Sequence, residues 1–113
     1  MGLGQYLFGL SSEDRAETYL KELKFEIIAR RFCSKFGEID IIAKGKNQIL
    51  HFIEVKATSG EYEVEYRLTP SKYVKILKAV DYYLMKNGLD SDFQIDLLVI
   101  KKEKIELIEN ISL

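Results

Sequence analysis

The chain has 113 residues, of which 47% are hydrophobic and 31% charged, and its formal net charge is −1. This length favours one domain over residues 1–113, with a core large enough to fold alone. The balanced charge gives the molecule no general attraction for nucleic acid, so any such contact must come from local patches. No apolar run approaches the ~20 residues that cross a membrane, so we expect no membrane contact.

Cysteine usage and the first residues indicate the compartment. Cys33 is the single cysteine, so an internal disulfide is excluded. Residues 1–10 are a mildly apolar lead segment without the basic start and small-residue cleavage site of a signal peptide. Both features favour the reducing cytoplasm.

A first helix is predicted over residues 12–23. Ser11 or Ser12 can cap it, and an apolar stripe recurs at helical spacing through Ala16, Tyr19, Leu20 and Leu23. Glu13 lies in the first turn, at the border of this stripe. It can serve as a partner of the helix dipole or as a member of a site on the buried face.

A strand is predicted over residues 25–32. Arg30 and Arg31 are expected to end it, and residues 33–35 to form a turn. With Lys35, the two arginines make a small basic cluster, which is either a solvated strand end or a contact for phosphate.

Two further apolar strands within residues 37–56 are joined by a polar turn. Asp40 interrupts the first and Glu54 the second. Carboxylates on adjacent buried strands are costly unless a cation compensates them, so this pair predicts a metal. Lys56 shares a strand face with Glu54, while His51 points to the other face and is expected to pack in the sheet.

The metal prediction requires a particular hairpin register. Pairing residue 40 with 54 also pairs 42 with 52 and leaves a three-residue loop at 46–48. A two-residue turn at Gly45-Lys46 would place Glu54 on the opposite face.

Residues 57–68 alternate between apolar and charged side chains, as is typical of a strand or a protruding β-arm. The segment can be an amphipathic strand of the same sheet, a lid over the site, or an arm that forms a homodimer through residues 61–68.

The C-terminal part predicts a helix and two strands. The helix begins at Thr69-Pro70 and ends at Asn87-Gly88. Lys72 lies in its first turn, where a cation opposes the dipole, so an anion contact is expected. Strands at 92–101, interrupted by Asp96, and at 105–108 complete an α/β domain with a mixed sheet flanked by helices.

Asp40, Glu54 and Lys56 suit phosphodiester hydrolysis. Carboxylate oxygens are ligands for Mg²⁺ or Mn²⁺, which activate water and stabilise charge on phosphate. A lysine can hold the attacking water or a phosphate oxygen. Without metal, the same three groups can form a structural lysine–carboxylate network.

Three motifs in this order and spacing resemble the YraN-like family of small bacterial proteins. They are Gly9-x-x-Ser12-Glu13-x-x-Ala16-x-x-Tyr19-Leu20, Gly37-Glu38-Ile39-Asp40-Ile41-Ile42-Ala43 and Phe52-Ile53-Glu54-Val55-Lys56. The resemblance covers residues 9–100. It implies the restriction-endonuclease-like PD-(D/E)xK fold and a likeness to Holliday-junction resolvases.

The resemblance also implies roles for single residues. Asp40 and Glu54 would hold the metal together with the Val55 carbonyl, Lys56 would be the catalytic lysine, and Glu13 would complete the acidic cluster through water. Lys72 and Asp96 match positions where the family tends to have Lys and Asp. Two departures, Thr58 and Gln94 where the family often has Arg, weaken phosphate binding.

The resulting expectation is a Mg²⁺-dependent endonuclease that hydrolyses DNA, including branched or structured DNA. Contacts to nucleic acid are expected from Lys72, Arg30 and Arg31. The alternatives are a non-catalytic module that binds nucleic acid or protein on a nuclease fold, and a nuclease that processes RNA.

Overall fold

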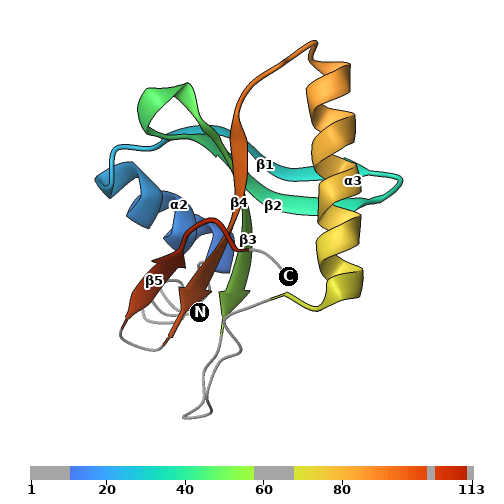
Figure 1. Cartoon of the computed structure of the whole chain (residues 1–113). Helices are drawn as coiled ribbons and strands as arrows, with labels where there is room; N and C mark the ends of the chain where they lie inside the picture. The colour runs from blue at the N-terminus through green and yellow to red at the C-terminus, as the bar shows by residue number, and fades with distance from the viewer. Residues whose placement is uncertain (1–10, 58–67, 102–103, 112–113) are drawn as a thin grey trace.

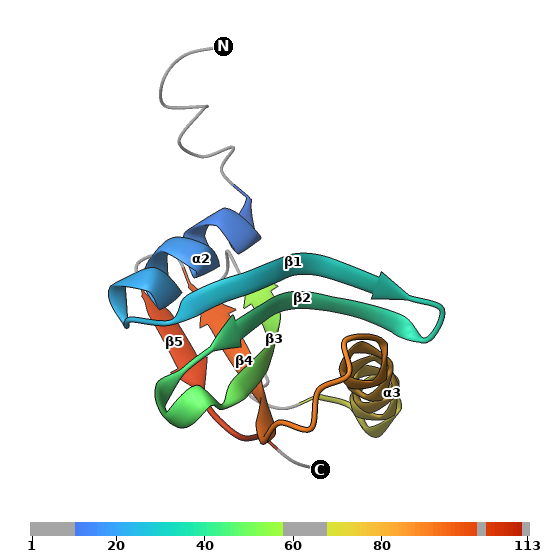
Figure 2. The ribbon, with the colours of Figure 1, turned by 90° about the horizontal axis from the view of Figure 1, so that it is seen from above.

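A computed structural model describes residues 11–57, 68–101 and 104–111 of the chain. A five-stranded sheet lies between two helices, which gives three layers (Figures 1 and 2). The elements are α2 (Ser12–Glu22), β1 (Glu26–Ser34), β2 (Gly37–Lys44), the 3₁₀ turn η1 (Lys46–Gln48), β3 (Leu50–Ala57), α3 (Pro70–Lys86), β4 (Phe93–Ile100) and β5 (Ile105–Ile108). The predicted α/β three-layer class is confirmed and is compatible with a restriction-endonuclease-like fold.

The spatial order of the strands equals their order in sequence, β1-β2-β3-β4-β5. Neighbouring strands are antiparallel except β3 and β4, which run parallel. Parallel strands need a long crossover, and the segment that carries α3 supplies it. The sheet is therefore mixed, as expected.

The pairs of the β2–β3 hairpin follow the register that the metal prediction requires, and they end at Ile41–Ile53, one residue before Asp40 and Glu54. Ile42 pairs with Phe52, and Lys44 pairs with Leu50. The Gly45 N–H then donates to the Ile49 carbonyl over 2.9 Å. These pairs leave the three-residue loop at 46–48, which forms the turn η1.

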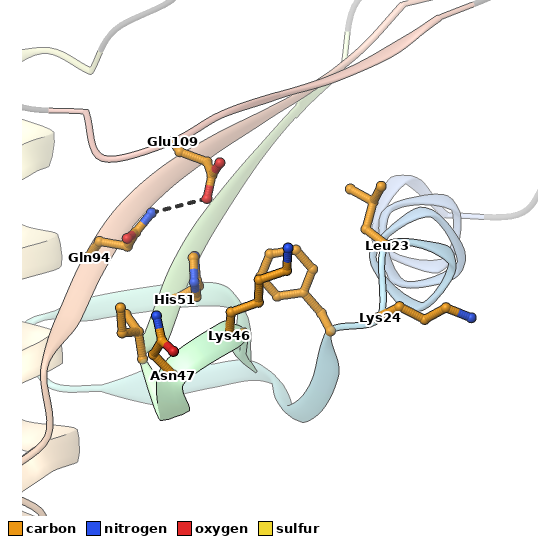
Figure 3. Close-up of a pocket in the computed structure, with 10 residues that line it drawn as sticks. Leu23, Lys24, Lys46, Asn47, His51, Gln94 and Glu109 are labelled. Carbon is orange, nitrogen blue, oxygen red and sulfur yellow. Dashed lines mark hydrogen bonds between the residues drawn. The ribbon is translucent and has the colours of Figure 1, made fainter.

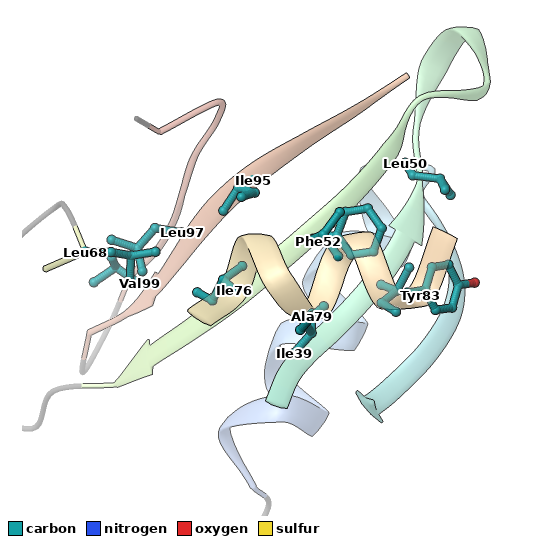
Figure 4. Packing of buried hydrophobic residues seen from close by; sticks show 12 residues of the cluster. Ile39, Leu50, Phe52, Leu68, Ile76, Ala79, Tyr83, Ile95, Leu97 and Val99 are labelled. Carbon is teal, nitrogen blue, oxygen red and sulfur yellow. The ribbon is translucent and has the colours of Figure 1, made fainter. Parts of the chain in front are cut away.

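The apolar side chains form one cluster on each face of the sheet. The cluster under α3 contains Ile39, Ile42, Leu50, Phe52, Leu68, Ile76, Ala79, Val80, Tyr83, Ile95, Leu97 and Val99 (Figure 4). The cluster under α2 contains Ala16, Leu20, Ile41, Ala43, Ile53, Leu98 and Ile100. Both faces of the central strands are thus covered, as their nearly continuous apolar sequences require.

Strand β2 changes face at Asp40. Residues two apart in a regular strand share a face, yet Ile39 packs under α3 and Ile41 under α2. The alternation expected through Glu38, Asp40 and Ile42 is therefore broken. The carboxylate of Asp40 bonds to the backbone of the neighbouring strand β3.

The helix caps agree with the sequence. Ser11 caps α2 in a capping box with Asp14, and Thr69 caps α3 with Pro70 in its first turn. The prediction for Leu23 is wrong, because this side chain is 46% exposed. Helix α2 ends at Glu22, and Lys24, with φ of 73°, turns the chain, so Leu23 lies beyond the helical stripe.

The predicted end of the first strand is also wrong. Strand β1 continues to Ser34, and the turn lies at residues 35–36, so Arg30 and Arg31 lie within the strand. Hairpin pairing with β2 runs on to Ser34 opposite Gly37 and extends the strand past the charged positions.

The predicted β-arm falls on residues 58–67, which lie outside the described residues, so the lid and dimer hypotheses remain predictions. Of its flanks, Ala57 ends β3, and Leu68 is buried in the cluster under α3. Among the helices in the described ranges, none is long and apolar enough to cross a membrane.

Candidate active site

Asp40 and Glu54 come from the neighbouring strands β2 and β3. Beyond the pair Ile41–Ile53, the carboxylate of Asp40 replaces a backbone carbonyl as acceptor: its Oδ2 accepts a hydrogen bond from the Val55 N–H over 2.8 Å. The change of face at Asp40 thus lets its side chain reach β3 within the plane of the sheet. One oxygen of Asp40 is fixed beside Glu54 by this contact.

Burial raises the pKa of both carboxyl groups above their ordinary values. For Asp40, desolvation is the largest cause, the Val55 N–H opposes it, and the charges of Glu13 and Glu38 raise the pKa further. For Glu54, desolvation is again the largest cause, and the charge of Asp40 adds to it. Ionising this acidic group is therefore unfavourable without a nearby cation.

Lys72 supplies a positive charge to Glu54. Its Nζ lies 2.8 Å from Glu54 Oε1, and this contact lowers the pKa of Glu54 against the effect of burial. The side chain of Lys72 is 52% exposed, whereas that of Glu54 is 11% exposed. The anion that Lys72 was expected to contact is, in this structure, the carboxylate of Glu54.

The other predicted residues of β3 lie next to Glu54. Lys56 is half-buried and stands two residues along the strand, so the two side chains share a side of β3. Val55 is half-buried and its N–H is engaged by Asp40. The structure therefore brings Asp40, Glu54, Val55 and Lys56 together with Lys72.

Glu13 approaches this group from α2. Its side chain is 20% exposed, and its Oε1 lies 3.6 Å from Arg31 Nε. Its charge raises the pKa of Asp40. However, among the described residues, Glu13, Asp40 and Glu54 do not form a group whose ligand atoms all lie within 4.8 Å of one another. A role for Glu13 through water stays a prediction.

The two arginines expected to bind nucleic acid lie against acidic residues of α2. Arg30 Nη1 is 2.7 Å from Asp14 Oδ1 and 3.8 Å from Glu17 Oε1. Arg31 contacts Glu13, as described above. Their charges are thus partly balanced within the molecule.

Sequence reasoning missed a second polar group, at the other end of β3. His51 is buried on the face opposite Glu54, as expected, but its Nδ1 lies 2.6 Å from Oδ2 of the fully buried Asp96. Gln94 and the backbone N–H of Asn110 bind the other oxygen of Asp96. In the sequence, Asp96 stands out as an aspartate inside an apolar strand. Its contact with His51 could not be predicted, because it depends on the register of the parallel strands β3 and β4.

The comparisons with known proteins cover nearly the whole chain. The family described as "Uncharacterised protein family UPF0102" matches residues 12–100, a range that contains every residue of the candidate site. UPF0102 proteins of Campylobacter concisus and Campylobacter hominis are 65% and 57% identical over 113 residues, 100% of both chains in each comparison. A UPF0102 protein of Campylobacter lari is 60% identical over 112 residues, 99% of each chain. These matches confirm the resemblance to the YraN-like family, and the chain belongs to the uncharacterised protein family UPF0102.

Proposed function

We propose that this protein is a metal-dependent endonuclease that hydrolyses phosphodiester bonds of DNA. The observation that carries the proposal is the proximity of Asp40 and Glu54 on neighbouring strands, where burial raises the pKa of both carboxyl groups. Stability alone does not favour two such carboxylates in one place. Acids with raised pKa values beside lysines are typical of catalytic sites.

The donor set fits a small hard cation. Asp40 and Glu54 would hold Mg²⁺ or Mn²⁺ through carboxylate oxygens, with the Val55 carbonyl as a further oxygen ligand. The contact from the Val55 N–H orients Asp40, which reduces the rearrangement needed when a cation binds. When bound, the ion lowers the pKa of a water molecule and offsets negative charge on the phosphate.

The lysines and Glu13 act around the carboxylates. Lys56, two residues after Glu54, holds the attacking water or a non-bridging phosphate oxygen. Lys72 is exposed enough to move from Glu54 to a phosphate when a cation takes its place beside Glu54. Glu13 orients a water molecule from the α2 side.

The charge distribution bears on the substrate. The net charge is −1, and Arg30 and Arg31 face carboxylates of α2. We therefore expect DNA affinity to be modest and to fall with added salt. Branched or structured DNA, which the family resemblance implies, would be held by shape rather than by charge alone.

The experiment that tests the proposal is a cleavage assay with a matched control. The purified protein is incubated with Mg²⁺ or Mn²⁺ on linear, forked and four-way DNA and on structured RNA. The double variant Asp40→Asn/Glu54→Gln should lose at least ~100-fold of the cleavage rate. Glu22→Gln, which alters the other Glu-x-Lys sequence at the end of α2, should retain it. Cleavage that survives the double variant would show contamination and overturn the proposal.

A second candidate function is a non-catalytic nucleic-acid-binding module. The ion pair between Lys72 and Glu54 favours it, because the lysine already neutralises one of the carboxylates without a metal. This function predicts nucleic-acid binding that EDTA does not change, with no cleavage under any metal condition.

A further inference from the structure

A second polar cluster lies on the α2 face of the sheet, away from Asp40 and Glu54. It contains His51 on β3, Asp96 on β4 and Glu109 just after β5. One potential ligand atom from each of these residues lies within 4.8 Å of the others, and among the described residues this is the group that meets that criterion. The cluster plays no part in the function proposed above.

The imidazole of His51 is held in one orientation. Its Nδ1 lies 2.6 Å from Asp96 Oδ2, and the ring of Phe25 packs edge-on against it at 4.8 Å between centroids. A Cβ at Gly45 would stand 2.6 Å from Nε2, so the glycine is needed for the imidazole to pack at this position. In the neutral imidazole with its proton on Nδ1 toward Asp96, Nε2 carries the lone pair.

Nε2 of His51 has no hydrogen-bond partner within the described part of the chain. The side chain is only 6% exposed, yet none of the described side chains has a polar atom that is both sealed from solvent and unpaired. Nε2 is therefore not sealed from solvent, and His51 lines a cavity. The nitrogen of a neutral imidazole is a common metal ligand.

The cavity has a volume of about 290 Å³, and Glu109 and Gln94 line it together with His51 (Figure 3). This space holds an ion with several waters. Asp96 does not line it and stands behind the imidazole, with both oxygens used in hydrogen bonds. A carboxylate that holds the far nitrogen of a histidine is the usual support of a metal-binding imidazole.

We propose that this cavity binds a divalent transition metal of the zinc class. His51 Nε2 and the Glu109 carboxylate are the ligands, water completes the coordination, and Asp96 is a positioning residue that acts through the imidazole. A nitrogen and a carboxylate oxygen suit Zn²⁺, whereas the all-oxygen set of Asp40 and Glu54 suits Mg²⁺.

The lysines at the rim do not prevent this binding. Lys24 and Lys46 also line the cavity, but both side chains are exposed, so water and salt screen their charges. Figure 3 shows Lys24 directed away from His51. The carboxylate of Glu109 has a weak neighbour: its Oε1 is 3.4 Å from Gln94 Nε2. A bound ion would displace this amide from the carboxylate.

The test measures metal binding and does not depend on nuclease activity. The full chain carries Cys33→Ser, because an exposed thiol could bind zinc. It is freed of affinity tag and metal and titrated with Zn²⁺ by calorimetry, and with Co²⁺ by visible absorption. We expect one saturable equivalent and a Zn²⁺-dependent shift of the His51 Nε2 resonance in NMR spectra, with the proton retained on Nδ1.

The variants decide between this site and any other. Glu109→Gln changes an exposed residue and should weaken Zn²⁺ binding at least about tenfold. Glu106→Gln, which neutralises an acidic side chain three residues earlier in β5, should leave binding within about twofold. No saturable binding, or binding that Glu109→Gln leaves unchanged, overturns the inference. Binding lost only in Asp40→Asn/Glu54→Gln also overturns it, while leaving the proposed nuclease function intact.

Discussion

Asp40 has two roles that a single atom change can separate. Its Oδ2 accepts the Val55 N–H and so ties β2 to β3, and its negative charge sits in a place where burial disfavours it. An asparagine keeps the acceptor and removes the charge, whereas an alanine removes both. The hydrogen bond serves the fold, and the charge serves the proposed metal.

Asp40→Asn is therefore expected to stabilise the metal-free protein while abolishing cleavage. In EDTA the melting temperature should rise by up to ~4 °C, a modest change because Asp40 is partly exposed to solvent. Asp40→Ala should lower it, because the Val55 N–H loses its acceptor. Thermal unfolding checks both variants. Equal destabilisation by Asn and Ala would show that the charge carries no penalty in the folded state.

Asp96 is the opposite case, a fully buried carboxylate that the fold requires. It accepts hydrogen bonds from His51, Gln94 and the Asn110 N–H. Asp96→Ala leaves these donors without an acceptor and should lower the free energy of unfolding by about 3 kcal/mol. Urea titration measures this loss. Asp90→Ala, at an exposed aspartate, should change stability by less than about 0.5 kcal/mol, and a similar loss in both variants would contradict the assignment.

Among the elements, α2 depends on its N-terminal cap. Ser11 accepts from the Asp14 N–H and Asp14 accepts from the Ser11 N–H, which closes a capping box. Asp14 also binds Arg30, so the cap ties α2 to β1. The orientation of Glu13 toward the candidate active site depends on this attachment.

Ser11→Ala should lower the free energy of unfolding by about 1 kcal/mol, because the Asp14 N–H loses its acceptor. The matched control is Ser12→Ala at the first helical position, which should cost less than about 0.5 kcal/mol. Chemical denaturation compares the two variants. An equal cost at both positions would mean that Ser11 is not the functional cap.

The elements also show which parts of the structure the sequence could predict. The helix caps, the ends of α3 and the register of the β2–β3 hairpin depend on residues close in the chain, and these predictions were confirmed. For Lys72 the sequence predicted contact with an anion, but it did not identify Glu54 as that anion. The pairing of His51 with Asp96 was missed, because it arises from the register of β3 with β4 across the α3 crossover. Local sequence patterns do not specify how two strands far apart in the chain align with each other.

At the scale of the whole molecule, the raised pKa values of Asp40 and Glu54 make stability depend on pH. Between the ordinary and the raised pKa values, the folded chain binds more protons at these two groups than the unfolded chain. Their contribution to stability therefore falls as pH rises. The loss begins near pH 4, where unfolded carboxyl groups ionise, and is complete above the raised values.

The expected result in EDTA is that Asp40→Asn/Glu54→Gln gains stability relative to the wild type as pH rises from about 4 toward neutral. Using the difference between two proteins cancels the opposite effect of Asp14 and Glu106, whose pKa values are lowered. Melting temperatures measured across this range check the sign. A difference that stays constant with pH would show that the two carboxyl groups do not titrate differently on unfolding.

Strand β3 pairs with β2, which is close in sequence, and with β4, which is far away in sequence. This difference suggests an order in which the two pairs form. Ile41 pairs with Ile53 across a short hairpin, whereas Leu50 pairs with Phe93 only after the segment carrying α3 has crossed over. Because closing the longer loop costs more entropy, we expect the hairpin to form first. Until β4 arrives, β3 presents an apolar open edge that could join another chain. Glu54 and Lys56 place charges on that strand, so we expect residues of the candidate active site also to oppose aggregation before β4 pairs with β3.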